Sequence, residues 1–530
     1  YDDPEEQAQR PLVLKFPDCG HIAVCGTVVS GKSTFMQTMI YGLINKYSPD
    51  EVQMYMLDFS SHLLSCFENA PHIGGVVSDN QEDRLDKFFN LLTDILDERR
   101  VVLQGGNYTQ YVQAFGIKLP AICVFIDNFA AFKTKCGDKY DEILQRLTRE
   151  GVGYGVFLIV SAQGFSIAEI PARLGDSIRT VLSLEQQDKF KYMDVLRRSR
   201  IEILPEAGVK GRGLVAVGEK TLEFQTALSL EAEDDFARGQ ALKKFSEDLR
   251  AQWAGKCARK IPSIPEKPTL SVFTQEEDYD SMIESGLIFP IGYRQRDAAL
   301  IGIPLRTSYC SVVTGRGRSG KTNTLKVWIE AAGRIGAKIV IVEKLSGDFS
   351  SFQNEITKWN GTLVPDDKGL FKYFESLVPE FKRRNVMKRQ FIEEGLDELA
   401  IGEKMSKEQP ICIFIDNLAD FINMIYRPSV GISPMSGFFE NIIEKGKLHN
   451  IYFIAGLKME DESLLMGYKG YNLFVADKSG IHLGGNLSSQ KIFGFQNIPF
   501  SEANKSLKKG FGHISTEEDE GEAIVIPSVK

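Results

Sequence analysis

The sequence has few residues of the kind that build metal clusters, and it lacks a long apolar run. Its 530 residues include eight cysteines and six histidines, with no Cys-x-x-Cys pair and no histidines at ligand spacing. We therefore expect a reducing compartment, without a disulfide framework or a zinc site. No apolar stretch reaches the roughly 18–20 residues that a membrane helix needs. The first residue is tyrosine rather than methionine, which leads us to expect a piece of a longer protein.

An excess of basic charge is lacking as well. The chain carries 63 lysines and arginines against 71 aspartates and glutamates, so its formal net charge is −8. Proteins that bind nucleic acid usually carry a basic excess or a basic stripe, and we expect no nucleic acid among the partners. The hydrophobic share of 43% is ordinary for a globular protein and supplies enough apolar surface for sizeable cores.

An internal repeat is the most informative feature that is present. The stretch GTVVSGKS at 26–33 is matched by GRGRSGKT at 315–322, and ICVFIDNFA at 122–130 is matched by ICIFIDNLA at 411–419. From the Gly-Lys motif to the strand aspartate, the distance is 95 residues in both halves. Equal spacing of two paired motifs indicates that the two halves are copies of one fold.

The segment KCARKIPSIPEKPTLSVF at 256–273 separates the copies, because its three prolines favour an extended linker. We predict one domain over 1–260, a linker over 261–273 and a second, degenerate domain over 274–530. Within each half, short apolar strands alternate with polar amphipathic stretches, which is typical of βαβ units. The sequence therefore predicts an α/β fold of two tandem P-loop NTPase domains with mostly parallel, doubly wound sheets.

Both Gly-Lys motifs fit the pattern G-x-x-x-x-G-K-[ST] of a phosphate-binding P-loop. Its glycines let backbone N–H groups point at the phosphates, its lysine bridges the β- and γ-phosphates, and its hydroxyl reaches Mg²⁺. We predict ATP and Mg²⁺ as ligands. The predicted nucleotide-binding residues are Gly26, Thr27, Ser30, Gly31, Lys32, Ser33 and Thr34 in the first copy, and Gly315, Gly317, Ser319, Gly320, Lys321, Thr322 and Asn323 in the second.

The strand-end aspartates complete each predicted site. Asp127 would hold Mg²⁺ together with Ser33, and Asp416 together with Thr322, although an aspartate in such a place also suits a helix cap or a turn. Gln163 follows the next strand, where a polar side chain would reach the γ-phosphate, and the second copy has Lys458 there. The predicted catalytic residues are Lys32, Asp127, Gln163, Lys321 and Asp416.

Each site lacks the glutamate that often follows the strand aspartate in a working ATPase. Asn128 and Asn417 stand there instead, and an amide can orient water but cannot take its proton. Removal of a catalytic base typically costs ~10²–10⁴ in rate, so we predict weak or absent hydrolysis.

Two further features bear on the first site. The bulk of Val28 and Val29 suggests a narrower phosphate-binding loop in the first copy. Arg212, in the stretch KGRG, is a candidate arginine finger.

Several of these stretches resemble the FtsK/SpoIIIE family of ATPases. The resemblance rests on residues 54–100, with a strand ending in Asp, a Pro-His turn at 71–72, a Val-Val pair at 76–77 and an acidic-Arg-Arg helix end at 98–100. The tandem arrangement, the altered Asp strands and the closing GIHLGGNLSSQKIFGF at 480–495 are more similar to one branch. This branch is the EssC/YukB type, found in type VII (ESX/WXG100) secretion.

The resemblance implies that the chain holds the second and third ATPase domains of a membrane-anchored protein. It implies RecA-like folds, a place at the cytoplasmic face of the cell membrane and assembly as a hexamer. Implied partners are small WXG100/ESX-type proteins, recruited through their C-terminal signals for export, and other membrane components of the secretion system. Nucleotide binding in these domains would be structural or regulatory more than hydrolytic.

Three other readings remain open at the level of sequence. A DNA-translocating FtsK-type motor would need catalytic carboxylates, basic pore loops and a DNA-reading C-terminal module, none of which the composition favours. A conventional ATPase could tolerate asparagine at 128 and 417. A scaffold with vestigial P-loops would bind no nucleotide.

Overall fold

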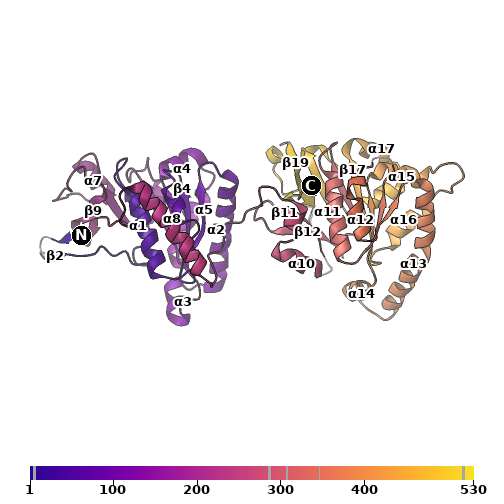
Figure 1. Ribbon diagram of the computed structural model, residues 1–530, viewed down its shortest axis with the longest axis horizontal. Coiled ribbons are helices and arrows are strands. Elements are labelled where there is room, and N and C mark those ends of the chain that lie inside the picture. Colours follow the sequence, from indigo (N-terminus) through magenta and orange to yellow (C-terminus); the bar gives the residue numbers. More distant parts are fainter. Residues whose placement is uncertain (4–7, 285–287, 306–307, 345–346, 516–519, 530) are drawn as a thin grey trace. The chain divides into compact units, whose positions relative to one another are not determined.

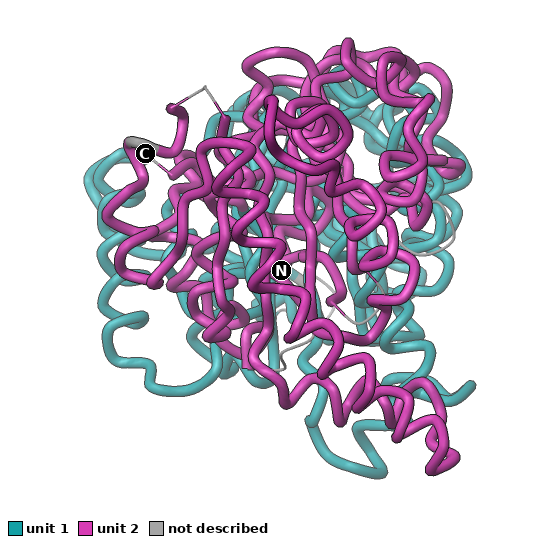
Figure 2. The backbone as a smooth tube through the Cα atoms, turned by 90° about the vertical axis from the view of Figure 1, so that its right-hand side faces the viewer, with its two compact units in different colours: residues 1–263 teal, residues 264–530 magenta. Residues whose placement is uncertain are grey.

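Two compact units make up the protein, residues 1–263 and 264–530. The computed structural model describes residues 1–3, 8–284, 288–305, 308–344, 347–515 and 520–529. Each unit is built around a ten-stranded mixed sheet with helices on its faces (Figures 1 and 2). No helix of the described residues is both long enough and apolar enough to cross a membrane.

The sheet of the first unit has the order β2-β1-β10-β9-β8-β3-β7-β6-β4-β5. Its strands are β1 (Asp2–Asp3), β2 (Ala8–Gln9), β3 (His21–Cys25), β4 (Val52–Asp58), β5 (Ile73–Ser78), β6 (Ala121–Asp127), β7 (Val156–Ala162), β8 (Ile178–Leu184), β9 (Arg212–Val217) and β10 (Lys220–Gln225). Its helices are α1 (Lys32–Lys46), α2 (Glu82–Leu103), α3 (Tyr108–Phe115), α4 (Phe129–Cys136), α5 (Asp141–Glu150), α6 (Ala172–Gly175), α7 (Lys189–Leu196) and α8 (Asp235–Gln252), with 3₁₀ turns η1 (Leu63–Phe67) and η2 (Gly151–Tyr154).

The second sheet repeats this order as β12-β11-β20-β19-β18-β13-β17-β16-β14-β15. Its strands are β11 (Ile288–Arg294), β12 (Leu300–Pro304), β13 (Cys310–Gly315), β14 (Lys338–Val342), β15 (Thr362–Val364), β16 (Ile411–Ile415), β17 (Ile451–Lys458), β18 (Gly480–Gly485), β19 (Leu507–Ser515) and β20 (Gly521–Val525). Its helices are α9 (Leu270–Phe273), α10 (Glu277–Glu284), α11 (Lys321–Arg334), α12 (Gln353–Lys358), α13 (Asp367–Glu393), α14 (Glu398–Met405), α15 (Leu418–Tyr426), α16 (Ser436–Lys445), α17 (Glu462–Leu465), α18 (Lys469–Phe474) and α19 (Phe500–Ala503), with 3₁₀ turns η3 (Ser350–Phe352), η4 (Met459–Asp461) and η5 (Leu487–Ser489).

The six strands from β8 to β5 are parallel, and antiparallel strands extend the sheet on one side only. Parallel strands need helices on both faces, so their sequences are apolar throughout. Side chains of β3 accordingly alternate between two cores, with Ala23 and Cys25 in one and Ile22 and Val24 in the other. In each unit one strand separates the P-loop strand from the strand of the predicted metal-binding aspartate. This order is RecA-like, and it confirms the predicted α/β fold.

An antiparallel hairpin closes the first unit behind its P-loop. The backbone N–H of Gly211, at the start of this β9–β10 hairpin, donates to the carbonyl of Ser30 at 2.9 Å. A Cβ at Gly31 would lie 3.1 Å from the nitrogen of Gly211, so the close approach favours glycine there. The hairpin is also the partner of the first strand, because Asp2 in β1 pairs with Glu223 in β10.

The stretch 261–273, expected to be a linker, is folded in part. Leu270–Phe273 forms α9, and Thr269 makes a bridge with Ser528. Phe273 is fully buried in the core of the second unit. Proline content predicted extended chain for the whole stretch, but a buried aromatic residue at its end outweighs that preference.

The side chain of Arg99 forms hydrogen bonds to the backbone just before two central strands of the first unit. It lies in α2 with 4% of its surface exposed. Its guanidinium donates to the carbonyls of Tyr154 (2.6 Å) and Gly155 (3.3 Å), just before β7, and to that of Pro120, just before β6. Three carbonyls at the strand starts are therefore satisfied by one side chain.

Arg384 in α13 has the same task in the second unit and is 2% exposed. Its guanidinium donates to the carbonyls of His449 (2.8 Å) and Asn450 (3.2 Å), before β17, and to that of Gln409 (2.7 Å), before β16. Arg99 and Arg384 thus join equivalent pairs of strands in the two units.

Three histidines are fully buried, His21 in the first unit and His449 and His482 in the second. Burial disfavours the charged imidazolium and lowers the pKa of each to about 4. All three are therefore neutral in the folded protein near neutral pH.

Candidate nucleotide-binding sites

The first P-loop connects β3 to α1 and forms the floor of a cavity of about 680 Å³. The ammonium of Lys32 donates to the carbonyls of Gly26 (2.8 Å) and Thr27 (2.7 Å) and so points along the loop. A Cβ at Gly26 would come within 2.4 Å of the Ser30 Oγ, so the turn requires glycine. Gly31 has φ 102° and ends the loop at the N-terminus of α1, where free N–H groups favour an anion.

A carboxylate with two hydroxyl donors lies beside this loop. Ser33 Oγ donates to Asp127 Oδ2 at 2.6 Å, and Ser161 Oγ donates to Asp127 Oδ1. Burial raises the pKa of Asp127, and these two donors partly oppose the shift. The pKa of Lys32 is lowered by burial, while the charge of Asp127 acts in the opposite direction. The site therefore joins an ammonium, a carboxylate and two hydroxyls in one partly buried corner.

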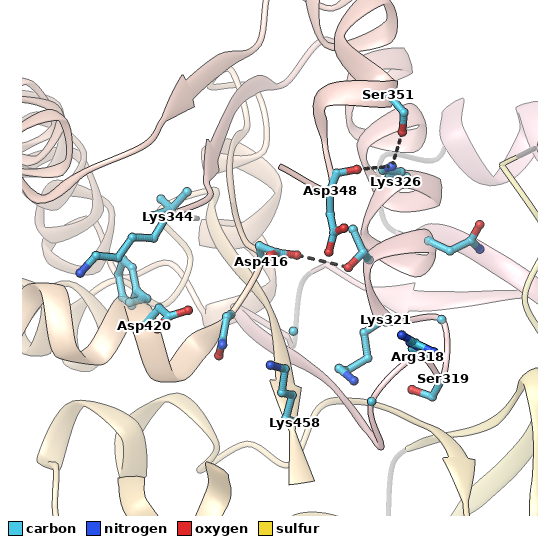
Figure 3. Close-up of a pocket in the computed structure, with 18 of the residues that line it drawn as sticks. Arg318, Ser319, Lys321, Lys326, Lys344, Asp348, Ser351, Asp416, Asp420 and Lys458 are labelled. Atoms are coloured by element: carbon cyan, nitrogen blue, oxygen red, sulfur yellow. Dashed lines mark hydrogen bonds between the residues drawn. The ribbon is translucent and has the colours of Figure 1, made fainter. Parts of the chain in front are cut away.

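The second P-loop, between β13 and α11, has the same geometry and a cavity of about 680 Å³ (Figure 3). Lys321 Nζ donates to the carbonyls of Gly315 (3.1 Å) and Arg316 (2.7 Å). Thr322 Oγ1 donates to Asp416 Oδ1 at 3.2 Å. Val28 and Val29, whose bulk was expected to narrow the first phosphate-binding loop, line the first cavity with 73% and 68% of their surface exposed.

The predicted residues divide into those that face a cavity and those that shape its loop. Gly26, Thr27, Ser30 and Gly315 shape the loops and are absent from the cavity walls, and the buried Oγ atoms of Ser30 and Ser319 have no partner among the described residues. The remaining predicted residues line the cavities: Gly31, Lys32, Ser33, Thr34, Asp127 and Gln163 in the first, and Gly317, Ser319, Gly320, Lys321, Thr322, Asn323 and Asp416 in the second.

These donor sets fit Mg²⁺, which prefers oxygen ligands and keeps several waters. Ser33 with Asp127, and Thr322 with Asp416, would hold the ion, which would neutralise phosphate charge when bound. The described residues contain no group of three or more His, Cys, Asp or Glu side chains placed to hold a metal. A P-loop needs none, because the nucleotide phosphates supply further ligands.

Asn128 and Asn417 are helix caps. Asn128 Oδ1 accepts from the N–H of Ala131 at 3.2 Å, and its amide donates to the Phe59 carbonyl at 3.3 Å. Asn417 Oδ1 accepts from the N–H of Ala419 at 3.0 Å. Both oxygens are therefore directed at backbone, a role that the sequence pattern did not indicate.

Replacing Asn128 by glutamate is expected to destabilise the first unit without creating an ATPase. Asn128 has φ 64°, a left-handed conformation that asparagine tolerates and glutamate adopts at a cost. Loss of the cap adds to this cost, for a total of about 2 kcal/mol. The checks are thermal unfolding and phosphate release. Asn128→Asp is the matched control, since it keeps the capping oxygen. A tenfold rise in hydrolysis for Asn128→Glu would contradict this assignment.

Other residues at the first site were partly or wholly missed. Ser161 carried one signal, a lone hydroxyl in an otherwise apolar strand. Lys210 and Gly211 lie in the repeated KGRG stretch and line the cavity. Arg212, the candidate arginine finger, is engaged within its own unit, where it donates to Glu206 at 3.2 Å and to Gln225 at 3.2 Å.

Two phosphate cradles on RecA-like sheets, each facing a strand-end aspartate, define a tandem P-loop NTPase. Comparison with known proteins agrees with this class. Residues 2–114 match the FtsK/SpoIIIE family. The chain is 23% identical over 522 residues to the ESX secretion system protein EccC of Geobacillus thermodenitrificans, covering 97% of the chain and 33% of that protein. It is 27% identical over 317 residues to the type VII secretion system protein EssC of Staphylococcus aureus, covering 59% of the chain and 21% of that protein.

Solved structures share the fold of this chain. EssC (ATPases 2 and 3) from Geobacillus thermodenitrificans has a TM-score of 0.80 at 20% identity, covering 100% of this chain and 95% of that one. Thermomonospora curvata EccC (ATPases 2 and 3), in complex with a signal sequence peptide, has a TM-score of 0.57 at 17% identity, covering 100% and 92%. Residues 2–114 of the first unit thus match the FtsK/SpoIIIE family, and the chain is similar to the type VII secretion proteins EssC and EccC. The chain spans between 21% and 33% of the length of the two relatives.

Proposed function

We propose that both units bind Mg·ATP as a structural or regulatory ligand within a type VII secretion ATPase. The observation that carries this proposal is the pairing, in each unit, of a P-loop lysine with a hydroxyl–carboxylate pair at the same corner of the cavity. Asn128 and Asn417 are used as caps, so the proposal assigns slow hydrolysis to both sites. A ligand at 100 times its Kd stabilises a fold by about 2.7 kcal/mol, which is a sufficient reason to retain such sites.

The parent protein, in this proposal, is membrane-anchored, with these units at the cytoplasmic face and a hexameric assembly. Small WXG100-type proteins would be recruited for export through their C-terminal signals. The support is the kinship to EssC and EccC and the signal sequence peptide bound by Thermomonospora curvata EccC. Nucleotide occupancy would then regulate the folded state of the units that meet the substrate.

Calorimetric titration of the 530-residue chain with Mg·ATP tests the nucleotide part. Two binding events are expected, one weakened at least tenfold by Lys32→Ala and the other by Lys321→Ala. Lys46→Ala is a matched control, because it removes the same charge from the exposed far end of α1. Absence of binding at millimolar ATP, with the variants folded, would reject the proposal in favour of vestigial loops.

A further inference from the structure

The two cavities differ in charge although their volumes are equal. Three basic and two acidic residues line the first, whereas six basic and three acidic residues line the second. The first set is Lys32, Lys210 and Arg238 with Asp127 and Asp235. The second set is Arg318, Lys321, Lys326, Lys344, Lys458 and Lys509 with Asp348, Asp416 and Asp420.

Lys458 holds the most informative position among these cations. It ends β17, and its Cα pairs with that of Gly315, the first glycine of the second P-loop. Lys458, Lys321 and Asp416 line the same cavity (Figure 3). In the first unit the corresponding residue is the neutral Gln163, directly after Ala162, which pairs with Cys25.

Two other cations of the second cavity, Lys326 and Lys344, already have partners. Lys326 Nζ donates to the carbonyl of Asp348 at 2.6 Å, and Lys344 lies 3.7 Å from Asp367. Within the described part of the chain, by contrast, Lys458 forms neither an ion pair nor a side-chain hydrogen bond. Its charge is therefore available to a ligand on the P-loop.

The charges around Lys321 support this placement. Lys321 is held on the carbonyls of Gly315 and Arg316, and Lys458 lies across from Gly315 at the end of the neighbouring strand. Two neighbouring cations that repel each other in the free protein are both stabilised by a polyphosphate between them.

The metal-binding corner is built differently in the second unit. Asp127 is 1% exposed and receives two hydroxyl donors, whereas Asp416 is partly exposed and receives Thr322 at 3.2 Å. Gly456 of β17 occupies the place of Ser161 of β7, and a Cβ there would lie 2.5 Å from the Asp416 carbonyl oxygen. A second hydroxyl beside this aspartate is therefore excluded by the backbone.

We propose that the second P-loop site does not depend on Mg²⁺ to bind a nucleoside triphosphate, because the Lys458 ammonium neutralises phosphate charge that only the metal ion neutralises in the first site. The inference rests on the proposed nucleotide binding and adds to it a different cation requirement for each site. The first unit would respond to Mg·ATP, and the second to ATP whether or not the metal ion is present.

Titrations of the 530-residue chain with ATP, in Mg²⁺ and in excess EDTA, test this assignment. Lys32→Ala isolates the second site and Lys321→Ala the first. EDTA is expected to weaken the first site at least tenfold and the second less than threefold. Lys458→Gln, made in the Lys32→Ala background, should restore a tenfold effect of EDTA. Gln163→Lys, made in the Lys321→Ala background, should reduce it.

Lys509→Gln, also in the Lys32→Ala background, is the matched control, because it removes the same charge from another wall of the second cavity. It should weaken ATP equally in both media and leave their ratio unchanged. Two results would overturn this inference while leaving the proposed function intact. One is an equal loss of ATP affinity in EDTA at both sites. The other is that Lys509→Gln changes the ratio of the affinities in Mg²⁺ and in EDTA as much as Lys458→Gln does. Absence of binding at the second site in both media would overturn the proposed function as well.

Discussion

Lowering the pH from 7 to 5 is expected to destabilise the second unit by about 4 kcal/mol, because two neutral, buried histidines resist protonation there. The pKa of His449 and of His482 is about 4 in the folded unit, lowered chiefly by burial. An unfolded histidine has a pKa of about 6.5. Between these values the unfolded chain binds more protons than the folded unit, so stability falls as the pH decreases. Each histidine contributes about 2 kcal/mol at pH 5.

The charged groups around these histidines act in the same direction. Lys388 and Arg384 lower the pKa of His449 further, and His513, Lys321 and Arg316 lower that of His482. His513, which pairs with His482 across β18 and β19 and is only partly buried, has its pKa lowered to about 4 by burial as well, and it adds a smaller, solvent-screened loss to that of the two fully buried histidines. The first unit, in which His21 has a pKa of about 4, should lose less stability over the same pH range.

Urea unfolding at pH 7 and pH 5, followed by tryptophan fluorescence, checks this result. Trp328 and Trp359 are in the second unit, and Trp253→Phe removes the remaining tryptophan of the chain. His449→Leu should reduce the difference between the two pH values by about 2 kcal/mol, since one titrating group is lost. Neither ring nitrogen of His449 has a partner among the described residues, so leucine leaves no group unsatisfied. Equal stability at both pH values would contradict the burial argument.

Arg99→Ala is expected to destabilise the first unit by about 3–5 kcal/mol, because three partly buried carbonyls lose their donor and an unsatisfied polar group costs about 1–3 kcal/mol. The substitution leaves the carbonyls of Pro120, Tyr154 and Gly155 without their donor. These carbonyls precede β6 and β7, so local opening should begin at the ends of those strands opposite the P-loop.

Hydrogen exchange of peptides from β6 and β7, together with thermal unfolding, measures this effect. Arg100→Ala is the matched control, since Arg100 is the neighbouring residue, its side chain is 65% exposed, and it lies 3.8 Å from Asp97. That surface substitution should change stability by at most about 0.5 kcal/mol. A loss for Arg99→Ala no larger than for Arg100→Ala would show that the three carbonyls find other donors.

Much of the fold could be predicted, because its signals are local. The first P-loop motif leads directly into α1, and the apolar part of ICVFIDNFA lies in β6. Apolar runs of this length mark strands buried on both faces, and the P-loop pattern fixes where a strand gives way to a helix. Because the motifs have equal spacing in the two copies, the fold predicted for the first half was also predicted for the second.

The missed features depend on backbone conformation or on contacts between distant residues. Asn128 caps its helix with a backbone φ of 64°. The sequence around the strand aspartate does not reveal this backbone conformation. The contact of Gly211 with Ser30 joins segments that lie far apart in the sequence. Ser161 acts on Asp127 only because β7 lies next to β6 in the sheet, and strand order is not visible in a single sequence.

The contact between Gly211 and Ser30 has a consequence during synthesis of the chain. Ser30 leaves the ribosome well before Gly211, and at ~5–20 residues per second the delay is roughly 10–40 s. For most of that interval β3 lacks its neighbours β7, which ends at Ala162, and β8, which ends at Leu184, and the P-loop lacks the backbone contact of Gly211 throughout. Pairings this distant are slow to form. The first P-loop is therefore completed only after the β9–β10 hairpin has been made, late in the synthesis of the unit.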